Sequence, residues 1–258
     1  MKKIIVTLVL VISSTIIFAQ TMVVKKSDGT YQEIAITTAV ELSFYGPCVG
    51  TPIVTDSRDS KVYNTVQIGS QCWLKENLNV GTMINSTAGG TNSDGNQTNN
   101  GNIEKYCFND TPDSCTKYGG LYQWAEAVQY QNGATNTSSP SPAFSGNVQG
   151  ICPTGWHIPT EAEMQTLATV AGNHSDVLKA VGQGGGAVMT NTSGFSALLA
   201  GYHTRTDNFQ GLGGDAIFWS STDNSGNAYF MDLNFGDDNI TVDSYNKTAG
   251  FSVRCCKD

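Results

Sequence analysis

Seven cysteines follow an N-terminal segment with the character of a secretion signal, and these two features together constrain the fold most. Lys2 and Lys3 precede an apolar run over residues 4–18, and Ala19 follows that run. A basic start, a short apolar stretch and a small residue are typical of a signal peptide, so we predict cleavage after Ala19. The mature chain is then exported to the periplasm, the cell surface or the extracellular space, where its cysteines are expected to form disulfides.

The composition favours short strands joined by long polar loops. Only 14% of the residues are charged, and the segments 85–103 and 131–150 consist largely of small polar residues and glycine. Such segments cannot build a core, so we predict surface loops. The 14 basic and 22 acidic residues give a formal net charge of −8, which argues against a nucleic acid or an anionic membrane as partner. We predict no integral membrane segment in the mature chain, because no later apolar run is long enough. The oligomeric state is left open.

A small unit is predicted ahead of the main domain. Met22–Lys26 and Tyr31–Ile36 flank a Ser-Asp-Gly-Thr turn, which is typical of a β-hairpin. Alternating apolar residues over 40–44 predict a third strand. Because an isolated hairpin is marginally stable in water, this unit should pack on the main domain or on a partner. The predicted boundaries are a signal peptide at 1–19, a hairpin segment at 20–46, a linker at 47–52 and one domain at 53–258.

The main domain combines two short helices with a late run of strands. Thr160 and Glu163 form a capping box at the start of one helix, and apolar residues spaced as in a helix run from Leu121 to Val128. Antiparallel strands are predicted at 216–220, 228–235, 240–245 and 250–255. This order of elements predicts the α+β class, with twisted antiparallel strands and long loops.

Several sequence blocks occur together in one order. The first begins at Cys152 and reads Cys-Pro-Thr-Gly-Trp-His-Ile-Pro-Thr-Glu-Ala-Glu-Met, and the last ends at Cys255 and reads Gly-Phe-Ser-Val-Arg-Cys. Between them stand Ser-Gly-Phe-Ser-Ala-Leu, Ala-Gly-Tyr and Phe-Trp-Ser-Ser-Thr, and an earlier block covers residues 55–78. In these blocks the chain resembles the Fibrobacter succinogenes major paralogous domain of secreted bacterial proteins. The resemblance implies a C-type-lectin-like fold, distantly similar to the formylglycine-generating (sulfatase-modifying) enzymes.

The cysteines suggest a disulfide framework for this domain. Cys107 and Cys115 flank a turn-rich loop that is short enough to close locally. Cys152 and Cys255 stand at the two ends of the family core, and a bridge between them would tie the last strand to the entry of the main helix. Cys48 and Cys72 are the third pair, which leaves Cys256 over. Cys255 and Cys256 should point to opposite faces of their strand.

The sequence offers no catalytic, cofactor or metal motif. The formylglycine-generating enzymes use a reactive cysteine pair shortly before a terminal block, and the matching stretch here, residues 240–249, contains no cysteine. The sequence has no Cys-x-x-Cys pair, and its three histidines are scattered, so a zinc site is not predicted. The Glu-Pro-Asn, Gln-Pro-Asp and Trp-Asn-Asp tripeptides of calcium-dependent lectins do not occur either. We therefore predict that the protein is not an enzyme and needs no cofactor or metal.

The tryptophans and loops suggest where a ligand would bind. Three of the four tryptophans are expected in the core, although indole rings also stack on sugars. His157 is expected to have a structural role with its hydrogen bonds satisfied, and not to act as a catalytic base. Binding residues tend to lie on loops held by a rigid scaffold, so we predict a ligand site from two loops. Its residues are Tyr202, His203, Arg205, Asp207, Asp237, Asp238 and Asn239. The acidic pair in the second loop resembles half of a calcium site or a plain hairpin turn.

Three functional hypotheses follow. The first is an exported, non-enzymatic recognition module that binds a glycan or a cell-surface protein through its polar loops. The second is a structural or assembly subunit whose N-terminal hairpin pairs with a strand of a partner. The third is an enzyme related to the formylglycine-generating enzymes, which the missing cysteine pair disfavours.

Overall fold

The computed structural model describes residues 20–25, 31–36, 46–86, 97–183, 190–204, 206 and 208–257, with side chains from residue 46 onward. The chain divides into two units, Met1–Phe44 and Tyr45–Asp258. In the first unit, β1 (Gln20–Lys25) pairs antiparallel with β2 (Tyr31–Ile36), and Gln20 lies opposite Ile36. These strands match the predicted hairpin. The predicted signal peptide and the third strand at 40–44 lie outside the described residues.

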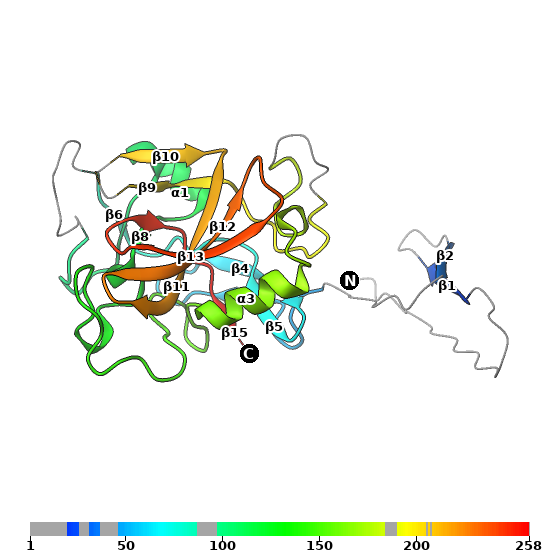
Figure 1. Ribbon diagram of the computed structural model, residues 1–258, viewed down its shortest axis with the longest axis horizontal. Helices are drawn as coiled ribbons and strands as arrows, with labels where there is room; N and C mark the ends of the chain where they lie inside the picture. Colours follow the sequence, from blue (N-terminus) through cyan, green and yellow to red (C-terminus); the bar gives the residue numbers. More distant parts are fainter. Residues whose placement is uncertain are drawn as a thin grey trace. The chain divides into compact units, whose positions relative to one another are not determined.

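The second unit is built mainly from small antiparallel sheets (Figure 1). One sheet has the order β15 (Cys256–Lys257), β5 (Gln71–Leu74), β4 (Val62–Ile68), β3 (Ile53–Thr55). A second has the order β10 (Phe209–Leu212), β9 (Ala200–His203), β14 (Gly250–Phe251), β8 (Tyr122–Gln123). The third consists of β11 (Asp215–Asn224), β12 (Asn227–Asn234) and β13 (Ile240–Asn246). A short parallel pair joins β6 (Thr82–Met83) and β7 (Glu104–Lys105).

In the described part of the chain, three α-helices accompany these sheets: α1 (Pro112–Tyr118), α2 (Trp124–Ala127) and α3 (Glu161–Val170). Three single 3-10 turns lie at Phe108–Asp110, Gln131–Gly133 and Ser175–Val177. The unit is therefore α+β, as predicted. None of the helices in the described part of the chain has the length and apolarity needed to span a membrane.

The predicted capping box determines where α3 begins. The Thr160 side chain accepts a hydrogen bond from the Glu163 backbone N–H at 3.2 Å, and Glu163 accepts one from the Thr160 backbone N–H at 2.7 Å. This reciprocal pair uses two donors that a helix start leaves without intrahelical partners. The buried face of α3 then carries Met164, Leu167 and Ala168.

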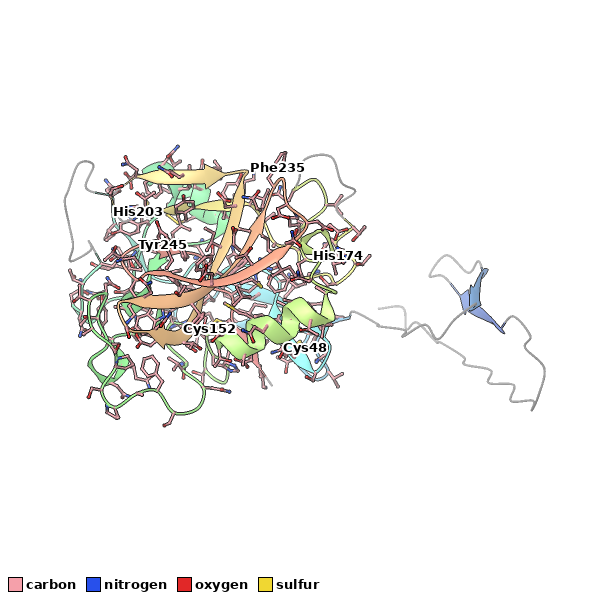
Figure 2. The ribbon with its side chains drawn as sticks, in the orientation of Figure 1. Cys48, Cys152, His174, His203, Phe235 and Tyr245 are labelled. Carbon is pink, nitrogen blue, oxygen red and sulfur yellow. A yellow bond between two sulfur atoms is a disulfide. The ribbon has the colours of Figure 1, made fainter. Side chains whose placement is uncertain are left out.

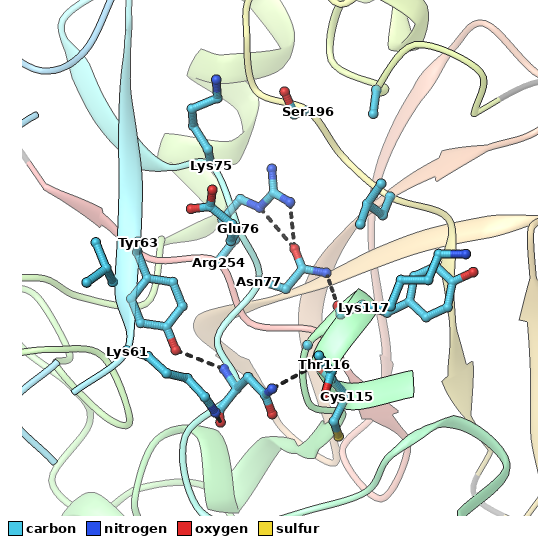
Figure 3. A pocket seen from close by; sticks show the side chains of 16 residues that line it. Lys61, Tyr63, Lys75, Glu76, Asn77, Cys115, Thr116, Lys117, Ser196 and Arg254 are labelled. Carbon is cyan, nitrogen blue, oxygen red and sulfur yellow. Dashed lines mark hydrogen bonds between the residues drawn. The ribbon is translucent and has the colours of Figure 1, made fainter. Parts of the chain in front are cut away.

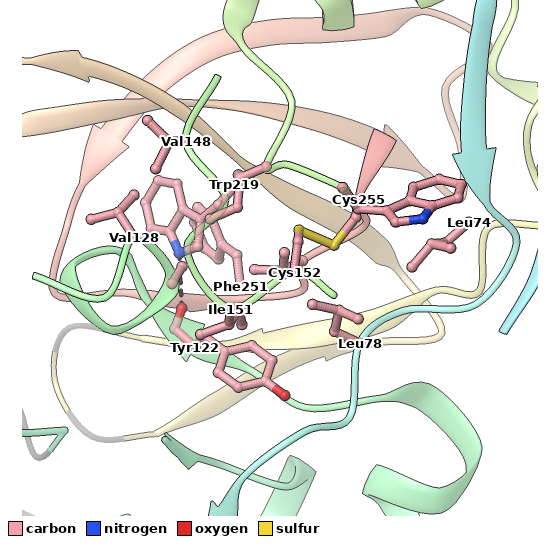
Figure 4. Packing of buried hydrophobic residues seen from close by; sticks show 14 of the residues in the cluster. Leu74, Leu78, Tyr122, Val128, Val148, Ile151, Cys152, Trp219, Phe251 and Cys255 are labelled. Carbon is pink, nitrogen blue, oxygen red and sulfur yellow. Dashed lines mark hydrogen bonds between the residues drawn. A yellow bond between two sulfur atoms is a disulfide. The ribbon is translucent and has the colours of Figure 1, made fainter. Parts of the chain in front are cut away.

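The core contains two large buried clusters. One surrounds α3 and contains Trp73, Phe195, Phe218 and Met231. The other surrounds Trp124, Trp219 and Phe251 and contains the Cys152–Cys255 disulfide; Figure 4 shows part of it. In that second cluster the Trp219 indole N–H donates to the Tyr122 carbonyl at 2.8 Å. A buried indole therefore keeps its hydrogen bond while its ring packs against apolar neighbours.

The structure contains the three expected disulfides, Cys48–Cys72, Cys107–Cys115 and Cys152–Cys255. Cys255 and Cys256 belong to different core clusters, as expected for neighbours on a strand. Residues 46–52, predicted as a linker, are held on the domain instead. Cys48 is bonded to Cys72, and the Gly46 and Pro52 carbonyls accept hydrogen bonds from the backbone of β4.

Some predicted elements were wrong in extent. The apolar spacing from Leu121 to Val128 predicts one helix, but β8 occupies its first part and α2 is a single turn. The segment between Cys107 and Cys115 contains the start of α1, which apolar spacing could not predict because Cys115 is its only buried residue. Of the predicted strand 250–255, only Gly250 and Phe251 form a strand, β14; the chain then crosses to another sheet, where β15 begins at Cys256.

Candidate functional site

A cavity of about 510 Å³ lies between β4, the chain after β5, and α1. Figure 3 shows the side chains that line it. The volume is within the range of small-molecule binding sites. The disulfide from Cys107 to Cys115 holds α1, which forms one wall.

Two asparagines position the chain that follows β5. Asn77 donates a side-chain hydrogen bond to the Tyr118 carbonyl at 2.9 Å, and Asn79 donates one to the Cys115 carbonyl at 2.7 Å. Both acceptors belong to α1. Gly119, which ends that helix, has φ +86°, and a Cβ there would lie 2.6 Å from the Asn77 Cβ. Glycine is thus required where the two segments meet.

Arg254 forms the floor of the cavity and is fully buried. Its Nε and Nη2 donate to the side-chain oxygen of Asn77 at 3.0 and 2.6 Å, and its Nη1 donates to the Phe195 carbonyl. The guanidinium carbon lies 4.2 Å from the centre of the Phe195 ring and 5.1 Å from that of Phe218. Aromatic faces attract a cation placed over them, which helps to hold this buried charge.

The charge of Arg254 has no carboxylate partner at ion-pair distance within the described residues. All its hydrogen-bond acceptors are neutral oxygens. Burial lowers the pKa of Arg254 to about 9, and the more distant Glu76 acts in the opposite direction. The side chain still carries its charge at neutral pH, and this charge adjoins the cavity.

The rest of the cavity lining is also basic. Lys61, Lys75 and Lys117 line it together with Arg254, whereas Glu76 is the only acidic lining residue among those described. The Glu76 carboxylate accepts two hydrogen bonds from Asn64, at 2.7 and 2.8 Å. In a chain with 22 acidic and 14 basic residues, this local excess of positive charge favours an anionic ligand.

The first predicted ligand loop is only partly exposed. His203 is fully buried, its ring stacks on Tyr106 with centroids 4.0 Å apart, and its Nε2 lies 2.9 Å from the Ser86 hydroxyl. Burial lowers the pKa of His203 to about 4. The prediction that His203 lies in a ligand-binding loop was therefore wrong, because it is the last residue of β9 and Tyr106, from a distant segment, covers it. Tyr202 is half-buried and donates to Gln210 at 3.2 Å. Arg205 and Asp207 lie outside the described residues.

The second predicted ligand loop is an exposed turn between β12 and β13. Asp237 accepts two hydrogen bonds from Asn239, and Asp238 pairs with His174 at 2.6 Å. The bonds between Asp237 and Asn239 are those expected of a hairpin turn, whereas the pair with His174 joins residues 64 positions apart. Figure 2 shows Phe235, which precedes this turn, well separated from His203. The ligand-binding roles of these loop residues stay predictions.

All four tryptophans are buried: Trp73, Trp124, Trp156 and Trp219 are 4% exposed or less. They are therefore core residues and do not form a sugar-stacking platform. His157 is buried as well, at 5% exposure.

The fold, the disulfides and the cavity together define a class: an α+β domain that is braced by three disulfides and carries a basic cavity. A family model described as the Fibrobacter succinogenes major domain matches residues 66–257. Because this match covers well over half of the 258 residues, the chain belongs to that family. No curated protein and no solved structure matches it.

Sequence reasoning missed the cavity. Its basic residues are spread over four segments between positions 61 and 254, and no spacing along the chain connects them. One signal was present: Arg254 is a charged residue inside an apolar block that ends at Cys255. A charged side chain in such a block is either paired or part of a site.

Proposed function

We propose that this protein is an exported, non-enzymatic recognition module that binds an acidic glycan in the basic cavity. The observation that carries the proposal is the buried guanidinium of Arg254, which has neutral hydrogen-bond partners and adjoins the cavity. A buried charge without a counter-ion is costly. A carboxylate or sulfate group of a ligand would provide the missing negative charge, and Lys75 and Lys117 would add contacts nearer to solvent.

The proposal includes a C-type-lectin-like fold. Its support is the membership of the family, the α+β arrangement of short helices and antiparallel strands, and the disulfide that ties residue 255 to residue 152. Export is supported by the three disulfides, which form in oxidising compartments. The non-enzymatic character is supported by the residues 240–249, which lack the cysteine pair of the formylglycine-generating enzymes.

An array of neutral, uronate-containing and sulfated oligosaccharides tests the proposal, with and without calcium. We expect the mature protein to bind acidic members in a salt-sensitive manner and to ignore their neutral counterparts. The double variant Lys75→Ala/Lys117→Ala should weaken binding about fivefold, because an exposed ion pair contributes roughly 0.5 kcal/mol. Lys257→Ala is the matched control, since Lys257 is exposed outside the cavity. Equal binding of neutral and acidic glycans would contradict the proposal.

A second candidate function is assembly through the N-terminal hairpin. The hairpin belongs to a unit distinct from the domain, and its described sheet contains two strands only. Both strands are therefore edges that could pair with a strand of a partner. Stable co-purification of a partner that is lost on deletion of residues 20–36, combined with an array without binding, would favour this function.

A further inference from the structure

A group of metal-ligand side chains lies on the opposite side of the last strand from the Cys152–Cys255 disulfide. The Nε2 of His157 lies 2.7 Å from the Glu163 Oε1 and 3.1 Å from the Cys256 Sγ, and the last two atoms are 3.6 Å apart. The ligand atoms of these three residues thus converge on one point. His157 and Cys256 are buried, and the Glu163 side chain is 15% exposed.

The backbone fixes this convergence. His157 and Cys256 exchange two backbone hydrogen bonds, each 3.0 Å long, which places their side chains next to each other. Glu163 is held by the capping box in the first turn of α3. The β-bridge between His157 and Cys256 and the first turn of α3 therefore bring the three side chains together, so their arrangement is preorganised.

A fourth polar group, the Gln71 side-chain amide, contacts Glu163. Gln71 is 6% exposed, and its Nε2 donates to the Glu163 carbonyl at 3.3 Å. Its Oε1 is buried and has no hydrogen-bond partner among the described residues. Cys256 lies directly opposite Trp73 in the ladder, so their side chains point to the same face of the sheet. Gln71 is two residues before Trp73 in β5 and therefore points to that face as well. A buried amide oxygen without a partner is costly unless something binds it.

We propose that His157, Glu163 and Cys256 bind a zinc ion, with the Gln71 side-chain oxygen or a water molecule as fourth ligand. Imidazole nitrogen, carboxylate oxygen and thiolate sulfur are the ligand types that zinc takes in tetrahedral sites. Ligand atoms of such a site are about 3.3–3.7 Å apart at normal zinc distances. The Cys256–Glu163 separation of 3.6 Å already fits, whereas the His157 nitrogen has to move about 0.6 Å from the Glu163 oxygen and about 0.4 Å from the Cys256 sulfur. Binding releases the thiol proton of Cys256 to solvent and displaces the proton that the His157 Nε2 donates to Glu163, which leaves a neutral imidazole with its proton on Nδ1; the glutamate and thiolate together neutralise the ion.

The ion would tie the C-terminal strand β15 to the start of α3. Its ligands stand at positions 157, 163 and 256, a spacing that matches no zinc motif in sequence. With its ligands largely buried, the ion would have a structural role.

Metal titration of the mature protein with its three disulfides intact tests the proposal. After chelator treatment, we expect one equivalent of Zn²⁺ to bind in competition with a chromophoric chelator and to raise the Tm. Co²⁺ should give a thiolate-to-cobalt charge-transfer absorption. Cys256→Ser should abolish this absorption and weaken Zn²⁺ binding at least tenfold. Glu163→Gln should weaken it as well, while glutamine keeps the capping box.

The control variant is His174→Gln. His174, Asp176 and Asp238 form a second, more exposed cluster of ligand types, so this variant reports metal bound there, and we expect unchanged Zn²⁺ affinity. Absence of stoichiometric Zn²⁺ binding by the parent protein would overturn the proposal. So would parental affinity in Cys256→Ser, or loss of binding in His174→Gln. Circular dichroism and disulfide mapping establish that each variant is folded.

Discussion

The side-chain oxygen of Asn77 accepts two hydrogen bonds from the Arg254 guanidinium, across 177 positions of the chain. The same amide donates to the Tyr118 carbonyl and, at 3.2 Å, to the Ser252 hydroxyl. Asn77 therefore connects α1, the chain after β5 and the C-terminal block at the floor of the basic cavity.

Replacing Asn77 by alanine should lower the free energy of unfolding by about 2–3 kcal/mol, because a buried charged group loses two hydrogen bonds. Urea denaturation measures this loss. The control is Asn64→Ala, whose side chain bonds to Glu76 at the surface and whose removal should cost about 0.5 kcal/mol or less. Equal stabilities of the two variants would show that the buried guanidinium does not depend on Asn77.

Trp156 is a core residue at 4% exposure. Trp156→Ala should cost roughly 3–5 kcal/mol, the range for truncating a large buried aromatic side chain. Thermal and chemical unfolding measure the effect, and Phe235→Ala, a change at a side chain that is 44% exposed, is the control. A loss below about 1 kcal/mol in Trp156→Ala would mean that the ring is not packed as described and would return it to the candidates for ligand stacking.

The disulfide from Cys152 to Cys255 closes a separation of 103 positions. Cys152→Ala/Cys255→Ala should destabilise the domain by about 4–5 kcal/mol on the chain-entropy model, because a long loop is freed in the unfolded state. A variant that lacks the Cys107–Cys115 disulfide should lose less stability, because its two cysteines are only eight positions apart. Peptide mapping of the non-reduced parent should recover all three pairs. Free thiols at Cys152 and Cys255 would refute this framework.

Glu126 should make stability depend on pH. Burial raises its pKa to about 7, although hydrogen bonds from Glu104, Tyr130 and Gln129 act in the opposite direction. The folded state therefore holds a proton that the unfolded state has released between about pH 4.5 and 7, so stability is greatest below this range and falls as pH rises through it. The expected loss is about 3 kcal/mol.

The matched variant for this prediction is Glu126→Gln, which keeps an acceptor for the Glu104 backbone N–H. Asp232 has its pKa raised by burial to about 7 as well, so the informative quantity is the difference between the two pH profiles. In the glutamine variant, residue 126 should no longer contribute to the pH dependence of stability. We therefore expect this variant to be more stable than the parent at pH 7. Parallel profiles would show that Glu126 ionises in the folded state as it does in water.

The features that the sequence predicted correctly depend on short-range signals. Thr160 and Glu163 are three residues apart, so their capping box can be recognised without a structure. The strands 227–234 and 240–246 show alternation and turn residues at hairpin spacing. Where local signals competed, prediction failed: the apolar residues from Leu121 to Val128 satisfied helical spacing, yet pairing with β14 drew Tyr122 and Gln123 into a strand.

The sequence by itself determined the helix start at Thr160, the main strands and the burial of three of the four tryptophans, since these follow from local backbone preferences and from hydrophobicity. The burial of His203 was decided by tertiary structure, because its cover is Tyr106 from a distant segment. The same holds for the basic cavity around Arg254 and for the cluster of His157, Glu163 and Cys256. Their groups converge only after strands and helix have packed, and no local pattern records contacts between segments as distant in sequence as residue 163 and residue 256.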